Sequence, residues 1–134
     1  MFKVGDTTTE KVIFSKQEVT AFVQLIGDPN PVHLDEEYAK NSYFKRLPVQ
    51  GMHAGSVFSR VIGASFPGEG SINMYREFTF IRPVFMDEEY TMTFRVVEID
   101  KDTHVGTIKC RLINPNGKVC VDCLTRIKNP QQFL

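Results

Sequence analysis

The chain has 134 residues, 42% of them hydrophobic and 24% charged, with equal numbers of acidic and basic residues and a formal net charge of zero. Without a run of lysines or arginines it lacks the basic surface typical of nucleic-acid binding, and a membrane surface is equally disfavoured as partner. No stretch approaches the roughly 18 apolar residues that cross a bilayer. We therefore expect one domain over residues 1–134, large enough to bury its own core.

The cysteines and the first residues both bear on the compartment. Three cysteines are an odd number, and Met1–Asp6 has no apolar core of a secretory signal, which predicts the cytoplasm. Cys120 and Cys123 have C-x-x-C spacing, but they fall in a run that alternates like a strand. Residues three apart on a strand point to opposite faces, so we interpret both as packing cysteines.

The first half of the chain predicts helices after a short strand at 10–14. Ser15 and Glu18 have capping-box spacing, and Gly27 supplies a helix stop. Between them, apolar residues recur at helical spacing: Val19, Phe22, Val23 and Ile26. A second, short helix is expected from Asp35 to Lys40. A third, from Met52 to Phe66, is apolar on nearly every side, which predicts that it is buried.

The second half changes to the period of strands. Apolar and polar residues alternate over 72–80 and 90–96, and two further runs at 105–113 and 118–128 are joined by a loop that contains Asn116-Gly117. The Asn-Gly pair is a strong hairpin signal. Strands with short connections after one buried helix predict an α+β fold, with an antiparallel sheet curled around that helix.

The loop between the first two helices carries the chemistry. Asp28 and His33 lie five residues apart in a segment stiffened by two prolines. A carboxylate and an imidazole held together can position a water and move its protons. The free amides of Gly51 and Met52, at the start of the buried helix, could stabilise negative charge on a carbonyl oxygen. Spacing alone leaves a purely structural alternative, in which Asp28 caps a turn and His33 is a satisfied polar residue.

Several segments resemble the MaoC-like dehydratase family, whose best-known members are (R)-specific enoyl-CoA hydratases. The similarity begins with the helix and loop of Phe22–Ala39 and extends through Gln50–Met52, Ser56–Arg60 and Phe78–Asp87 to the final strands. The G-D-x-N-P-x-H loop and its spacing to Gly51 are its most specific part. The resemblance implies a hot-dog fold, an antiparallel sheet wrapped around one long helix.

The resemblance also implies roles for individual residues. Asp28 and His33 match the catalytic pair, Gly51 the oxyanion-hole glycine, Ser59 a serine that supports the aspartate, and Asn30 a structural asparagine of the loop. The implied enzyme is a hydro-lyase that adds water to trans-2-enoyl-CoA and gives (R)-3-hydroxyacyl-CoA, reversibly. No cofactor and no metal are expected, with the coenzyme A thioester as substrate.

Two alternatives stay open. The same chemistry could act on acyl-carrier-protein thioesters, as a (3R)-hydroxyacyl dehydratase of fatty-acid synthesis, or the chain could be a non-catalytic acyl-thioester-binding module. The intact Asp28–His33 pair argues against the second. Family members pair their sheets, so a homodimer or a dimer of dimers is expected.

Four other polar residues need an interpretation. Gln50 stands where the family often has histidine, and we expect it to alter loop packing or substrate shape rather than remove the chemistry. His53, just inside the helix, should be neutral because a cation is disfavoured there. Arg82 and Lys101 could both meet coenzyme A phosphates, and nothing in the sequence chooses between them.

Overall fold

The computed structural model describes residues 1–134, and its elements follow the predicted order. In chain order they are β1 (Thr7–Ile13), α1 (Lys16–Ile26), the 3-10 turn η1 (Pro31–His33), α2 (Glu36–Lys40), α3 (Gly51–Ala64), β2 (Ile72–Phe80), β3 (Glu89–Asp100), β4 (Val105–Ile113) and β5 (Val119–Lys128). No helix is both long and apolar enough to cross a membrane.

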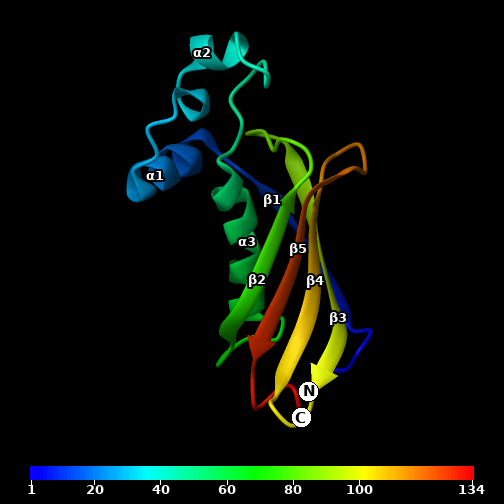
Figure 1. Ribbon diagram of the computed structural model, residues 1–134. Coiled ribbons are helices and arrows are strands. Elements are labelled where there is room, and N and C mark those ends of the chain that lie inside the picture. Colours follow the sequence, from blue (N-terminus) through cyan, green and yellow to red (C-terminus); the bar gives the residue numbers. More distant parts are fainter.

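The five strands form one antiparallel sheet in the order β1-β3-β4-β5-β2. Figure 1 shows α3 lying along one face of this sheet, with α1 and α2 gathered at one end and both termini at the other. The core lies between α3 and the sheet, where Phe58 and Val61 pack with strand residues such as Phe94 and Ile108. The predicted α+β fold, a sheet around one helix, is confirmed.

Local signals in the sequence account for the ends of α1. The Ser15 hydroxyl accepts a hydrogen bond from the Glu18 amide at 3.1 Å and donates one to the Glu18 carboxylate at 2.9 Å. Gly27 ends the helix in the left-handed region, at φ 73°, where a residue without a side chain is favoured. Because this cap turns the chain sharply, the loop that follows it leaves the helix axis at Asp28.

The central helix contacts β2 through a row of small residues. A Cβ at Gly51 would lie 3.4 Å from the ring of Phe80, and a Cβ at Gly55 would lie 2.7 Å from the ring of Phe78. One turn further along, Ser59 accepts a hydrogen bond from Arg76. The expectation that this helix is buried on nearly every side was wrong for the single chain, because Ser56, Ser59 and Arg60 are exposed and Met52 is 51% exposed.

Strand β2 forms an open edge of the sheet. It pairs only with β5, and its other side has no neighbour. Large apolar side chains on and just after this strand are exposed, namely Ile72, Met74, Tyr75, Phe80 and Ile81. A long apolar edge of this kind is rarely left bare in a native protein.

Candidate active site

The loop after α1 is held by its own side chains. Oδ1 of Asp28 accepts a hydrogen bond from the Asn30 amide at 2.9 Å, and Oδ1 of Asn30 accepts one from the Val32 amide at 3.2 Å. These side-chain-to-backbone bonds fold the segment into the short turn η1. Pro29 and Pro31 restrict the backbone further. The loop therefore presents Asp28 and His33 in a fixed relation.

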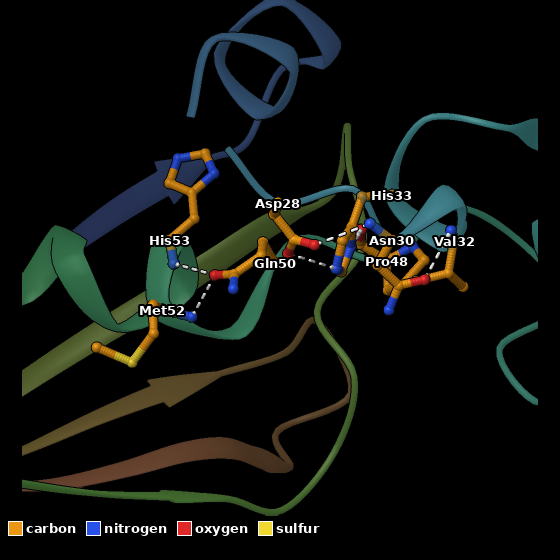
Figure 2. Close-up of polar contacts among 8 residues, drawn as sticks. All are labelled: Asp28, Asn30, Val32, His33, Pro48, Gln50, Met52 and His53. Carbon is orange, nitrogen blue, oxygen red and sulfur yellow. Dashed lines mark hydrogen bonds and ion pairs between the residues drawn. The ribbon is translucent and has the colours of Figure 1, made fainter. Parts of the chain in front are cut away.

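Asp28 and His33 face each other, as Figure 2 shows. His33 Nε2 lies 3.6 Å from Asp28 Oδ2, and the two side chains are only 11% and 18% exposed. The other ring nitrogen, Nδ1, lies 3.1 Å from the carbonyl oxygen of Pro48. A carbonyl oxygen can only accept, so Nδ1 carries a hydrogen, and Nε2 is the ring nitrogen that faces the carboxylate.

The start of α3 differs from the expectation in one respect. Oε1 of Gln50 accepts hydrogen bonds from the amides of Met52, at 2.6 Å, and His53, at 3.1 Å (Figure 2). The prediction of a free Met52 amide was therefore wrong, because the glutamine side chain caps the helix. No hydrogen bond in the structure uses the Gly51 N–H, which leaves that donor for a ligand.

A cavity of about 300 Å³ opens beside this helix start. Its lining is mostly apolar and consists of His33, Tyr43, Phe44, Pro48, Val49, Gly51, Ala54, Phe80, Ile81, Arg82, Pro83, Val84 and Val121. His33 and Gly51 thus share one cavity, although Gly51 follows His33 by eighteen residues. Asp28 does not line this cavity. It faces His33 Nε2, and it borders a more open surface hollow together with Pro29 and Asn30.

Ser59 lies away from the pair. It sits two turns along α3 from Gly51, and its hydroxyl is taken by Arg76 of β2. Within one chain no hydrogen bond joins it to Asp28. The supporting role that the resemblance implies for Ser59 therefore remains a prediction.

His53 is buried but does not line the cavity. Its ring stacks on Phe22, with centroids 4.7 Å apart, and meets Phe14 edge-on at 5.2 Å. Burial lowers the pKa of His53, against a smaller opposite effect of Glu18, so the ring is neutral as expected. Its Nδ1 is buried without a hydrogen-bond partner. Figure 2 shows the ring directed away from Asp28 and His33.

The cysteines pack within the sheet. All three are buried and unpaired, and Cys110 of β4 stands opposite Cys123 of β5. The neighbouring Cys123 thiol, together with burial, raises the pKa of Cys110. Cys120 and Cys123 form no disulfide, and no three potential metal-ligating side chains gather anywhere in the chain.

Several residues of the site were not found from the sequence. Tyr43, Val84 and Val121 come from three separate segments, and only their tertiary arrangement brings them to one cavity.

Of the two cations that could meet coenzyme A phosphates, Arg82 and Lys101, only Arg82 lies at the cavity. It lines the cavity, and its Nη1 donates to the Val119 carbonyl at 2.7 Å, whereas Lys101 lies in the turn between β3 and β4.

Comparisons with known proteins identify the family to which the chain is similar. A family model described as a MaoC like domain matches residues 2–114. The (R)-specific enoyl-CoA hydratase of Aeromonas caviae is 34% identical, over 96% of this chain and 96% of the relative. The mitochondrial 3-hydroxyacyl-[acyl-carrier-protein] dehydratase FERN of Solanum lycopersicum is 30% identical, over 91% of this chain and 74% of the relative.

Solved structures are similar over the same extent. An (R)-hydratase from A. caviae involved in PHA biosynthesis superposes with a TM-score of 0.92 at 33% identity, covering 96% of this chain and 98% of the other. The unliganded R-hydratase from Pseudomonas aeruginosa gives a TM-score of 0.90 at 29% identity, covering 96% and 83%. The expected hot-dog fold is thereby confirmed.

Proposed function

The chain belongs to the MaoC-like domain family, and we propose that it is a hydro-lyase that adds water to trans-2-enoyl-CoA. The product is (R)-3-hydroxyacyl-CoA, and the same site catalyses the reverse dehydration. One observation carries this proposal: the half-buried Asp28 and the buried His33 face each other, with Oδ2 and Nε2 3.6 Å apart, and His33 shares an apolar cavity with Gly51. The relative from A. caviae, named for this reaction, supports it.

The pair is suited to hold the reacting water. When the imidazole is neutral and donates its one hydrogen from Nδ1 to the Pro48 carbonyl, Asp28 Oδ2 and His33 Nε2 are both acceptors. Two acceptors side by side repel each other, but one water can donate a hydrogen to each of them. Such a water has its oxygen lone pairs directed away from both groups, toward a substrate carbon.

The proton and electron transfers of the hydration can be assigned to the water, the Asp28–His33 pair and the thioester. The water oxygen bonds to the β-carbon of the enoyl thioester while its proton passes to the Asp28–His33 pair. The electrons of the double bond move toward the thioester oxygen, and a proton from the pair is delivered to the α-carbon. Dehydration reverses each transfer. Because these steps need only acid–base groups, an oxyanion donor and water, we propose no cofactor.

The Gly51 amide is the proposed oxyanion donor. Its N–H has no acceptor within the protein, while the Gln50 side chain takes the next two amides. A thioester oxygen beside Gly51 would therefore accept a hydrogen bond from a backbone N–H that has no other partner. Donors of this kind are typically worth about 10²–10³ in rate. The same glycine has no side chain, which leaves room for Phe80 to pack beside it.

We propose coenzyme A as the carrier of the acyl group. Arg82 is the only permanent cation among the residues that line the cavity. Its hydrogen bond to the Val119 carbonyl holds the guanidinium in place. Arg46, which lies outside the cavity lining, is already paired with Glu88 at 2.7 Å. One free cation suits a small phosphorylated arm better than an acidic protein surface, which needs many. Acyl-carrier protein is the alternative substrate in the test.

We also propose a homodimer in the cytoplasm. The unpaired edge of β2, with its exposed apolar residues, gives a second copy a surface to cover. Two such dimers could associate further. The three unpaired cysteines are compatible with a reducing compartment.

The test is direct hydration of crotonyl-CoA, followed as loss of the conjugated thioester absorbance, with chiral analysis of the product. The proposal expects turnover to (R)-3-hydroxybutyryl-CoA. An (S) product or no turnover on any enoyl-CoA would overturn it. Turnover of crotonyl-acyl-carrier protein with no activity on the coenzyme A thioester would establish the alternative carrier.

A further inference from the structure

Side chains of α3, β2 and β5 meet in three successive layers that begin at the cavity, each with one residue from each of these elements. Phe80 pairs with Val121 across the two strands, and its ring covers Gly51. All three of these residues line the cavity. This first layer is therefore open to a ligand.

The next layer is closed. Phe78 pairs with Cys123, and none of Phe78, Cys123 or Gly55 lines the cavity. The Phe78 ring lies so close to the helix that a Cβ at Gly55 would be 2.7 Å from it. The ring also stacks on Phe80, with centroids 5.7 Å apart. Phe78 thus fills the space that the glycine leaves and ends the cavity.

The third layer is polar. Arg76 pairs with Thr125, donates to its hydroxyl from Nε at 3.3 Å, and donates from Nη1 to Ser59. An acyl chain that passed Phe78 would have to lie against these polar groups, which would lose access to water. The closed layer therefore separates the apolar cavity from these polar groups.

We propose that Phe78, seated on Gly55, is the floor of the acyl pocket and restricts the enzyme to short-chain enoyl thioesters. A cavity of about 300 Å³ corresponds to about ten water-sized groups, which leaves room for roughly four to six acyl carbons beside the thioester. This inference rests on the proposed function, because it concerns the chain that the same site accepts.

The experiment measures kcat/KM for crotonyl-, hexenoyl-, octenoyl- and decenoyl-CoA with the wild type, Phe78→Ala and Phe78→Leu. A methylene that loses or gains room in an apolar pocket changes kcat/KM about ten- to two-hundred-fold. We expect the wild type to fall at least about tenfold between hexenoyl and octenoyl, and the octenoyl-to-crotonyl ratio to rise at least about tenfold in Phe78→Ala. The ratio is taken within each protein, so it does not depend on the amount of folded enzyme.

Phe133→Leu is the matched control for Phe78→Leu. The Phe133 ring also covers a glycine, Gly106, but lies outside the cavity. We expect the Phe133→Leu variant to keep the wild-type dependence of kcat/KM on chain length, while Phe78→Leu shifts it toward longer chains. Phe78→Leu therefore tests the proposal even if Phe78→Ala does not fold. Equal wild-type rates on crotonyl- and decenoyl-CoA, an unshifted profile in both Phe78 variants, or the same shift in Phe133→Leu would overturn the proposal. Wild type inactive on every chain length would instead refute the proposed function.

Discussion

His33 Nε2 lies 3.6 Å from Asp28 Oδ2, and in a neutral ring that donates its hydrogen from Nδ1 to Pro48 both of these atoms are acceptors. Two neighbouring acceptors without a hydrogen between them form a site for a donor. Water is the smallest molecule that can donate to both at once. This relation connects the loop geometry to the hydration that we propose.

Gln50→Ala tests the cap of α3. The variant removes the oxygen that accepts from the Met52 and His53 amides, so we expect the free energy of unfolding to fall by about 1 kcal/mol. Activity should change little, because the proposed donor is the Gly51 amide. Chemical denaturation and crotonyl-CoA hydration measure the two effects, with Gln50→Glu, which keeps an acceptor, as the control. An Ala variant as stable as wild type would refute the cap.

Gly55→Ala tests the contact beneath the cavity. The new methyl group would press on the Phe78 ring, and overpacking of this kind typically costs about 1–3 kcal/mol. In a Phe78→Ala background the clash disappears, and the same change should become neutral or stabilising by about 0.5–1 kcal/mol, as alanine is favoured over glycine in a helix. A double-mutant cycle by denaturation measures this coupling. Equal effects in both backgrounds would contradict it.

His53→Phe tests the effect of the buried histidine on pH dependence. Burial holds the pKa of His53 below its usual 6.5, so the unfolded chain binds this proton more readily than the folded one. The pH-dependent penalty is therefore absent well above pH 6.5, where both states are neutral, and it grows as the pH falls below that value. We expect the wild type to lose more stability than His53→Phe between pH 7 and pH 5. Parallel curves in that range would show that His53 does not titrate differently on folding.

Arg82→Gln tests the carrier end of the site. Loss of the one cation that lines the cavity should raise KM for crotonyl-CoA about 1.5- to fivefold, the range for an exposed ion pair, with kcat nearly unchanged. Crotonyl-N-acetylcysteamine has no phosphate and should show no such change. Lys101→Gln, in the turn between β3 and β4, should match the wild type on both substrates. An equal KM increase on both thioesters would exclude a phosphate contact.

Local features of the site could be predicted from sequence, while its tertiary features could not. Asp28 and His33 lie in one short loop, where proline restriction and the Gly27 cap are enough to hold them together. Glutamine is not among the preferred helix caps, so the role of Gln50 and the loss of the free Met52 amide were missed. The closure by Phe78 depends on the register of β2 against both β5 and α3. Alternation shows which strand residues share a face, but it does not show which helix residue they meet.

The most direct measurement of the central claim is the hydration of crotonyl-CoA by Asp28→Asn. Asparagine keeps the size of the side chain and an oxygen for the Asn30 amide, but it cannot accept the proton of the water. We expect kcat/KM to fall by about 10²–10⁴-fold, with an unchanged circular dichroism spectrum and Tm. A folded variant that hydrates crotonyl-CoA at the wild-type rate would contradict the account.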